Sequence, residues 1–315
     1  MGDLNKNRLD ATDLVFFKRQ LEIIKRKVYN EKNRILQGAM LIPVDPEVRG
    51  EGIEAITYRS YSKTGVAAFF GDYGGSIPRV DVYGEETTIK PKRYGAAYGF
   101  STFEIKKASR AGVQLRSMKA SAAMRSMEEK TDKILWEGVP KLGIQGFLDY
   151  PGIQEYAVPE GSAASGTSAE KKEWANKTSS EIYADMRAMV KTPKINTNEI
   201  EVPNTLLLPT EQYELIKDIQ FSTGSDLTIM EYFKRNNPTI EVVSVSYLGG
   251  RGDGGTDRMI AYVKDLDHLS QEFPVPPKSE PPFQEDEFNY RITMWAEHAG
   301  VIVYYPQSVI FGDGI

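Results

Sequence analysis

The chain has no cysteine and only two histidines, His268 and His298, among its 315 residues. The first absence excludes disulfides, cysteine metal ligands and thiol nucleophiles, and the second leaves little material for imidazole chemistry. Eighteen apolar residues never run together, so the sequence predicts no membrane-spanning helix. The first residues, Met1 to Lys6, lack the apolar core of a secretory signal, so we expect no export.

An excess of positive charge is also missing, because the formal net charge is −5. Domains dedicated to nucleic-acid binding usually carry a basic excess that neutralises phosphates, so the composition argues against such a domain. A hydrophobic content of 40% over 315 residues suits a globular protein with one large domain or two ordinary ones.

The most informative stretch is a long helical pattern that ends in glycines. Between Ser101 and Gly138, apolar residues recur at spacings of three and four, which predicts one apolar helix face. That face comprises Ala108, Ala111, Leu115, Met118 and Ala122. We expect Gly112 to divide the pattern, and the second helix, from about Gln114 to Glu137, to span about 36 Å.

The end of this second helix carries acidic residues, which are unfavourable to the helix dipole. They are Glu128, Glu129, Asp132 and Glu137, so we expect groups outside the helix to offset them. The helix then runs into a glycine-punctuated loop, Gly143-Ile-Gln-Gly146-Phe-Leu-Asp-Tyr-Pro-Gly152.

This combination resembles the major capsid proteins of tailed phages and their encapsulin relatives, whose long spine helix ends in a similar Leu-x-x-Gly, here Leu135 to Gly138. Three further segments carry the resemblance by their order: Tyr98-Gly-Phe-Ser-Thr-Phe-Glu-Ile105, Pro203-Asn-Thr-Leu-Leu-Leu-Pro209 and Gly300-Val-Ile-Val-Tyr-Tyr-Pro306. The resemblance implies an α+β fold: a tailed-phage capsid fold with an N-terminal arm, an extended β-hairpin loop, a long spine helix in a peripheral domain, and a mixed α/β axial domain. The residues marking the spine-helix end are Asp132, Leu135, Trp136 and Gly138.

Residues 11–37 place Leu14, Phe17, Leu21, Ile24 and Val28 at helical spacing, interleaved with lysine and arginine. This pattern leaves two readings open, a basic arm and a terminal helix packed on its own domain. The resemblance implies an arm over residues 1–51 that lies under neighbouring subunits. The expected contact residues are Phe16, Phe17, Leu21 and Ile24.

Residues 52–100 are rich in Thr, Val, Tyr, Ile and Phe around the glycine-rich segment 71–78, which predicts two long strands and a tip. Because an isolated two-stranded hairpin is marginally stable, it should rest on something else. The resemblance implies an extended loop that overlaps the next subunit, although a hairpin inside an ordinary mixed domain is the alternative. Tip contacts are expected from Tyr73, Gly74, Gly75, Ile77 and Pro78, and Lys63 is the candidate for the loop crosslink that some family members form.

Small polar residues between Val158 and Thr178 predict a loop that separates two modules. By resemblance, residues 101–178 form the peripheral domain with the spine helix and this loop, and residues 179–265 form the axial domain. Its expected elements are a helix from Ser179 with serine N-caps, a strand at 202–208, helices at 209–219 and 227–233, and strands at 239–245 and 258–263.

Alternating patterns predict strands at 288–295 and 300–305. By resemblance, residues 266–315 are the C-terminal strands that return to pair beneath the spine helix. The prolines at 274, 276, 277, 281 and 282 predict a stiff connector that is poorly suited to strand pairing.

Several apparent motifs do not indicate catalysis or ligand binding. The segment Gly249–Gly255 lacks the Gly-Lys-Ser/Thr ending of a phosphate loop, and we attribute its Arg-Gly-Asp tripeptide to chance. Adjacent acids such as Glu128 and Glu129 point about 100° apart on a helix, which does not aim both at one substrate. His298 is interpreted as structural. We therefore expect no catalytic, cofactor-binding or metal-binding residues.

The resulting hypothesis is a major capsid protein that assembles as hexamers and pentamers into an icosahedral shell around double-stranded phage DNA. Its expected partners are itself, the packaged DNA by non-specific contact, a separate scaffold or none, and portal and decoration proteins, with no membrane. Its expected location is the virion, assembled in the bacterial host cytoplasm. The alternatives are an encapsulin-like compartment loaded with protein cargo and, less favoured, a soluble α/β enzyme.

Overall fold

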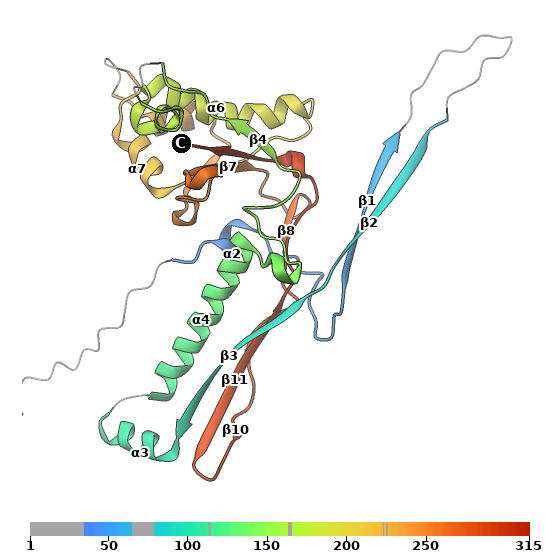
Figure 1. Ribbon diagram of the computed structural model, residues 1–315, viewed down its shortest axis with the longest axis vertical. Helices are drawn as coiled ribbons and strands as arrows, with labels where there is room; N and C mark the ends of the chain where they lie inside the picture. Colours follow the sequence, from blue (N-terminus) through green and yellow to red (C-terminus); the bar gives the residue numbers. More distant parts are fainter. Residues whose placement is uncertain (1–34, 65–78, 113–114, 163–165, 223, 225) are drawn as a thin grey trace, which may run out of the picture. The chain divides into compact units, whose positions relative to one another are not determined.

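The structure is a computed structural model that describes residues 35–64, 79–112, 115–162, 166–222, 224 and 226–315. Contacts divide the chain into Met1–Ile35 and Leu36–Ile315, and the second unit is described below. Its strands form four sheets among the described residues (Figure 1). None of the helices described is both long and apolar enough to cross a bilayer.

The first sheet is a two-stranded hairpin of β1 (Ile56–Thr64) and β2 (Asp81–Ile89). The strands are antiparallel and in continuous register from Ile56 opposite Ile89 to Thr64 opposite Asp81. The hairpin was predicted to extend to Phe100, but residues after Ile89 leave it, because β3 (Lys92–Ser101) pairs with β11 (Asn289–His298) instead.

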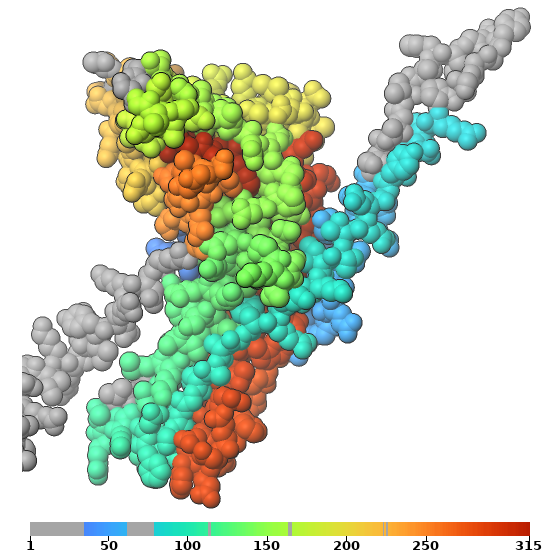
Figure 2. Space-filling view, in the orientation of Figure 1, coloured from blue at the N-terminus to red at the C-terminus, as the bar shows by residue number. Residues whose placement is uncertain are grey.

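The second sheet joins residues far apart in the sequence. On the other edge of β11 lie β9 (Val275–Ser279) and the short β10 (Phe283–Gln284). Figure 2 shows the segment of β3 running alongside the C-terminal segment of β11. The prediction that the proline-rich connector would not pair was wrong, because β9 contains Pro276 and Pro277 and still pairs with β11. An outer strand tolerates prolines because one of its edges needs no N–H donors.

Two helices follow β3, as the sequence predicted, and they are α3 (Thr102–Arg110) and α4 (Leu115–Glu137). Ser101 caps α3, since its Oγ accepts from the Phe103 N–H and Glu104 accepts from the Ser101 N–H. The 23 residues of α4 span about 35 Å. Ala123 and Met127 of α4 pack with Met294 and Ala296 of β11.

The predicted apolar face of this helical region was wrong. None of its five residues is buried, and Met118 is 44% exposed. The buried side of α4 instead begins at Ala123 and continues through Met127 and Leu135. The first half of α4 mixes Ala, Ser, Met and Lys with too little apolar contrast to define which side is covered.

The largest sheet has the order β4-β13-β7-β5-β6. Its strands are β4 (Gln154–Ala157), β5 (Thr205–Leu208), β6 (Glu241–Ser244), β7 (Arg258–Tyr262) and β13 (Val309–Asp313). Alternate residues face opposite sides of a strand, so Leu206 and Leu208 join one core and Leu207 joins another. The sheet therefore separates two hydrophobic clusters.

The first of these clusters lies under α6 (Ser179–Asn196), α7 (Thr210–Asp218) and α8 (Ile229–Asn236). The predicted strands and helices between 179 and 265 are all present within a few residues. The sheet also takes β4 and β13 from outside that range. Thr178, rather than either serine, precedes the first turn of α6, and Glu181 accepts from its N–H and hydroxyl.

Shorter elements complete the unit. The helices are α2 (Gly38–Leu41), α5 (Ser168–Lys172), and the 3-10 turns η1 (Pro140–Leu142), η2 (Trp174–Asn176), η3 (Ser246–Leu248), η4 (Asp253–Gly255) and η5 (Pro306–Ser308). A third small sheet pairs β8 (Leu269–Glu272) with β12 (Gly300–Val303). Of the predicted C-terminal strands, β11 packs against α4, whereas β12 pairs with β8.

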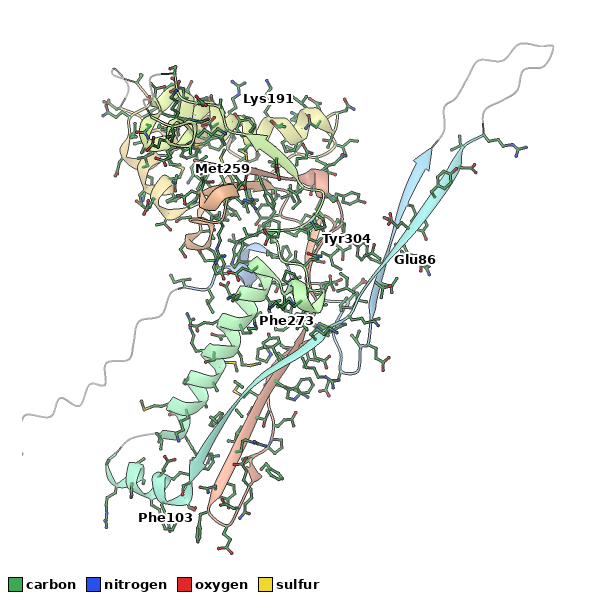
Figure 3. The ribbon with its side chains drawn as sticks, in the orientation of Figure 1. Glu86, Phe103, Lys191, Met259, Phe273 and Tyr304 are labelled. Atoms are coloured by element: carbon green, nitrogen blue, oxygen red, sulfur yellow. The ribbon has the colours of Figure 1, made fainter. Side chains whose placement is uncertain are left out.

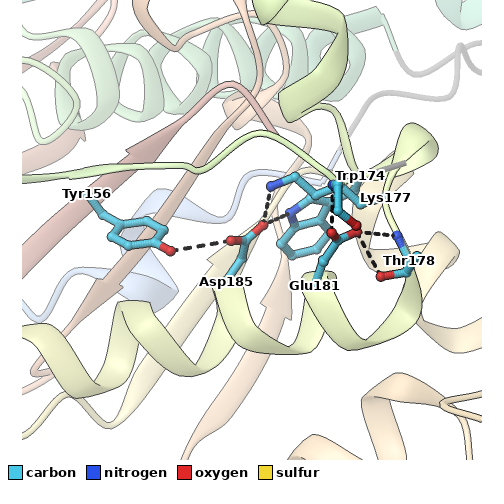
Figure 4. A network of polar contacts seen from close by, with 7 residues as sticks. Tyr156, Trp174, Lys177, Thr178, Glu181 and Asp185 are labelled. Carbon is cyan, nitrogen blue, oxygen red and sulfur yellow. Dashed lines mark hydrogen bonds and ion pairs between the residues drawn. The ribbon is translucent and has the colours of Figure 1, made fainter. Parts of the chain in front are cut away.

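The segment predicted as a loop between Val158 and Thr178 contains a buried polar network (Figure 4). Lys177 and Asp185 form an ion pair of 2.6 Å with both side chains only 1% exposed. Trp174 Nε1 and the Tyr156 hydroxyl also donate to the Asp185 carboxylate, at 3.2 and 3.3 Å. Burial raises the pKa of Asp185 above its usual range, although all three donors oppose that shift. The segment thus anchors α6 rather than merely connecting two modules.

Candidate functional site

The end of α4 is held by close contact between two glycine backbones. Gly138 has a φ of +65°, and a Cβ there would lie 2.4 Å from the Gly146 nitrogen. The returning loop is bonded to the last turn, since the N–H groups of Phe147 and Leu148 donate to the carbonyls of Leu135 and Trp136 at 2.8 and 3.0 Å. Only glycine permits this approach, which explains the Leu-x-x-Gly ending.

The predicted spine-helix end residues are therefore internal. Asp132, Leu135 and Trp136 are buried, and the Trp136 ring stacks on Tyr247 with centroids 5.9 Å apart. The Gly38 N–H, at the start of α2, donates to Asp132 Oδ1 at 2.8 Å. These residues fix the direction in which the chain leaves α4.

The acidic end of α4 has the outside partners that its sequence requires. From outside the helix, the Tyr247 hydroxyl donates to Glu137 Oε1 at 2.9 Å and Arg251 forms an ion pair with the same oxygen. Within α4, Lys133 lies 3.4 Å from Glu137 Oε2. Burial opposes ionisation of Glu137, but Tyr247, Arg251 and Lys133 together outweigh it and lower the pKa of that carboxyl. The sequence predicted such groups but not their identity, and Arg251 belongs to the Arg-Gly-Asp tripeptide attributed to chance.

Among the described residues, the hairpin contacts the rest of the unit near its base. Tyr58 of β1 packs edge-on against Tyr304 with ring centroids 5.5 Å apart, and burial raises the pKa of Tyr304 to about 12. Further out, Tyr61, Val82 and Tyr83 are 65%, 58% and 62% exposed. Because Val82 and Tyr83 are consecutive in a strand, they lie on opposite faces. Apolar surface is therefore uncovered on both faces of the hairpin.

The remaining contacts within the hairpin are between exposed groups. Arg59 pairs with Glu86 at 2.7 Å, and the hydroxyls of Thr57 and Thr88 are 2.9 Å apart. Figure 3 labels Glu86 on the hairpin, and its partner Arg59 directly follows Tyr58, the residue that packs against Tyr304. Exposed pairs contribute little, typically below about 1 kcal/mol. The hairpin is consequently a ribbon whose stability needs a further surface.

The predicted tip residues Tyr73, Gly74, Gly75, Ile77 and Pro78 lie outside the described residues. So do the arm residues Phe16, Phe17, Leu21 and Ile24, and nothing is described of the Lys63 side chain. The assignment of all of them to intersubunit contacts stays a prediction.

A cavity of about 580 Å³ lies beside the hairpin base. Its lining includes Asp45, Glu47, Tyr58, Ser60, Asp267 and Tyr304. Among the described residues that line it there is no histidine or lysine to activate Ser60 as a nucleophile. Across the described ranges, no group of three or more His, Asp or Glu side chains is placed to hold a metal ion.

His298 is fully buried at the end of β11. The Gly300 N–H donates to its Nδ1 at 2.8 Å, which requires that nitrogen to be unprotonated, and burial lowers the pKa of His298 to about 3. Its ring lies beside Phe273, with centroids 4.9 Å apart. This environment suits a structural side chain better than a proton carrier at neutral pH.

Comparison with known proteins identifies the family. The sequence profile of the Major capsid protein family matches residues 65–315. The chain belongs to the major capsid protein family. It is a structural protein of the icosahedral shell of tailed phages and not an enzyme, so the soluble-enzyme alternative is excluded.

Solved structures confirm the capsid fold of this major capsid protein. It is similar to the capsid of Myoviridae phage XM1, with a TM-score of 0.80 and 18% identity over 94% of this chain and 98% of that one. The capsid of cyanophage P-SCSP1u gives a TM-score of 0.62 and 12% identity over 93% and 92%. A virus-like particle from Pyrococcus furiosus gives 0.52 and 12% over 89% and 92%. A search of curated protein sequences finds no match.

Proposed function

We propose that this major capsid protein assembles as hexamers and pentamers that close around double-stranded phage DNA. The observation that carries the proposal is the hairpin β1–β2, whose apolar side chains are exposed on both faces and which no other described strand joins. A ribbon of this kind is marginally stable in isolation, and a neighbouring subunit supplies the surface that it lacks.

In this proposal the hairpin is the extended loop, α4 is the spine helix of a peripheral domain, and the five-stranded sheet with α6, α7 and α8 is the axial domain. Residues 1–51 act as an arm beneath neighbouring subunits, with Phe16, Phe17, Leu21 and Ile24 as contacts. The hairpin tip contributes Tyr73, Gly74, Gly75, Ile77 and Pro78. Many modest contacts then sum, because each subunit both gives and receives an arm and a hairpin.

Deletion of residues 71–78 tests the proposal. The shortened chain should remain soluble but fail to form closed particles in electron microscopy, because β1 and β2 keep their register while the tip is lost. A matched control deletes residues 163–165 from the Gly/Ser-rich segment, which should leave particles intact. Particles of normal size and yield from the 71–78 deletion would contradict a role for the tip.

A second candidate is an encapsulin-like compartment that holds protein cargo. It is supported by the similarity to the virus-like particle from Pyrococcus furiosus, which shows the fold alone. Nuclease digestion of purified particles separates the two candidates. Protected DNA favours the phage capsid, whereas particles without nucleic acid that co-purify with one protein favour the compartment.

Further partners follow from the same proposal. A shell that packages DNA in the bacterial cytoplasm needs a portal, and a separate scaffold or decoration proteins complete the assembly. If the purified chain stays unassembled, addition of a candidate scaffold protein should yield particles. Continued failure with scaffold present would argue against an autonomous shell protein.

A further inference from the structure

The cavity of about 580 Å³ beside the hairpin base has walls from three separate parts of the chain. One wall is residues 58–61 of β1, the second is residues 45–47 after α2, and the third comprises residues 266–267 and 304–305. Small-molecule sites usually have volumes of about 300–1,000 Å³. The cavity is therefore large enough to hold a ligand of that class.

The charge on the cavity wall is negative and is not neutralised by the part of the chain that the structure describes. Asp45, Glu47 and Asp267 line the cavity, and none of the three forms an ion pair with another described residue. Arg59 also lines it, but its guanidinium is already paired with Glu86 at 2.7 Å. The wall thus presents uncompensated carboxylates to whatever occupies the cavity.

Tyrosine rings form much of the remaining lining. Tyr58 and Tyr61 come from β1, and Tyr304 and Tyr305 follow β12. Figure 3 labels Tyr304, whose ring packs edge-on against Tyr58. Tyr61 and Tyr305 are more than half exposed. Aromatic rings attract an ammonium group that lies within about 6 Å of the ring centroid, and aromatic cages are a common way to bind organic cations.

A buried carboxylate behind the tyrosine wall adds to the negative potential. Glu272 is fully buried, and its Oε2 has no hydrogen-bond partner among the described residues. The Ser270 hydroxyl donates to Glu272 Oε1 at 2.6 Å and lies 3.0 Å from the Tyr304 hydroxyl, so this carboxylate is joined to the cavity wall. Burial raises the pKa of Glu272, and the charge of Asp45 raises it further. A cation placed between Asp45 and Tyr304 would relieve this unfavourable accumulation of charge.

We propose that this cavity binds an aliphatic diamine or triamine, whose ammonium groups meet the carboxylates and whose chain lies on the tyrosine rings. More than one ammonium group is expected because Asp267 and the neighbouring acids Asp45 and Glu47 belong to different walls. A metal ion fits less well, since no group of three or more His, Asp or Glu in the described ranges is placed to hold one. All the lining residues belong to one chain, so the inference does not depend on the proposed shell.

Isothermal titration of the chain with spermidine tests the proposal. At low ionic strength the native chain should bind one spermidine per subunit. The double variant D45N/D267N should weaken that binding by about tenfold, because each exposed charge pair contributes a factor of a few. Tyr305→Leu keeps every charge but removes one ring face, so it should weaken binding by about threefold.

A matched control changes the net charge equally at residues outside the cavity lining. Asp218 and Asp226 are exposed and form no ion pair within the described ranges. The variant D218N/D226N should therefore bind spermidine as the native chain does. Asparagine at position 45 still offers an oxygen to the Glu47 N–H, so the local turn is kept. Circular dichroism checks that every variant is folded.

Protection from trypsin gives a second readout, because the ligand would join β1 to the opposite walls of the cavity. Arg59 lies in β1 on the cavity lining. Cleavage after Arg59 should be about threefold slower with saturating spermidine, since a ligand that bridges two parts of a protein opposes their local separation. The protection should be absent in D45N/D267N, which also controls for any effect of spermidine on the protease.

Three results would overturn the proposal. The first is the absence of saturable binding by the native chain at about 1 mM spermidine. The second is equal weakening in D45N/D267N and D218N/D226N, which would mean that spermidine responds only to net charge. The third is saturable binding of magnesium chloride at the same ionic strength that D45N/D267N abolishes, which would assign the cavity to a metal ion instead.

Discussion

Replacing Gly138 by alanine should be among the most damaging single-methyl changes in this protein. A Cβ at that position would lie 2.4 Å from the Gly146 nitrogen and 2.5 Å from the Ile144 carbonyl oxygen, both backbone atoms that no rotamer change can move aside. The residue also has a φ of +65°, which disfavours any side chain. Two separate penalties therefore coincide.

Their sizes follow from the local structure. A left-handed conformation costs alanine about 1–2 kcal/mol, partly offset by the lower entropy of the unfolded alanine chain. To clear the methyl, the loop must move by about 1 Å, which disrupts the two hydrogen bonds from Phe147 and Leu148, each worth about 0.5–1.5 kcal/mol. Overpacking against the backbone of Ile144, Gln145 and Gly146 adds about 1–3 kcal/mol. The expected total is about 2–7 kcal/mol, a large part of a typical domain's stability.

Alanine variants at two neighbouring glycines measure the backbone penalty and the steric penalty separately. Gly143 has a φ of +73° with open space around its Cβ position, so Gly143→Ala should cost only about 1 kcal/mol. Gly146 has no positive φ, but its Cβ would lie 2.3 Å from the Gly138 nitrogen, so Gly146→Ala should cost about 3–5 kcal/mol. Urea unfolding of dilute, unassembled subunits measures the loss in free energy of unfolding for all three variants. Equal losses for Gly138→Ala and Gly143→Ala would refute the steric argument.

Three further predictions use the same unfolding assay. Burial lowers the pKa of His298 to about 3, so between about pH 6.5 and pH 3 the unfolded chain binds one more proton than the folded chain, and the free energy of unfolding should fall as the pH falls through that window. His298→Asn still offers an acceptor to the Gly300 N–H and should flatten the dependence of the free energy of unfolding on pH. An unchanged pH dependence would contradict this assignment. Lys177→Met leaves Asp185 buried without its cation and should cost about 3–5 kcal/mol, whereas a loss below about 1 kcal/mol would show that water reaches the carboxylate. Asp132→Ala removes a buried acceptor at the start of α2 and should cost about 1–3 kcal/mol, with a neutral result indicating that α2 readjusts.

Elements with strong local signals were predictable from the sequence. The division near Gly112 and the end of α4 at Gly138 follow from glycine, because both residues have a positive φ that glycine adopts without steric cost. The strands and helices between 179 and 265 follow from periodicity and capping residues within one segment.

Features that depend on distant partners were not predictable in the same way. The buried side of α4 is decided by Met294 and Ala296, which lie more than 150 residues away and belong to a strand of another segment. The pairing of β9 depends on its place at the outer edge of β11, where Pro276 and Pro277 are tolerated. The composition of the segment around Trp174 predicts a loop. The ion pair that orders this segment includes Asp185 of α6, which lies outside the segment, so the local composition gives no sign of it.

The candidate site shows the same difference between features with a local sequence signal and features that depend on distant residues. The glycines and acids at the end of α4 were recognisable as a motif, but the groups that satisfy Glu137 come from a loop 110 residues later. Phe103 in α3, Phe283 in β10 and Phe288 in the turn before β11 are exposed without any local signal, since an apolar residue is expected in the core until its neighbours are known.

The exposure of the hairpin explains how a soluble subunit can form a stable shell. Covering Tyr61, Val82 and Tyr83 on a neighbour would contribute about 1.5–3 kcal/mol for each side chain, which is too little to hold two subunits together against the entropy of association. In the proposed shell each subunit would give one hairpin and receive another, so the same contact would act twice per subunit, and the proposed arm contacts would add to it. Weak individual contacts then allow errors to dissociate during growth, while closure makes the completed particle stable. A stronger hairpin contact is therefore expected to trap misassembled particles instead of raising the yield of closed ones.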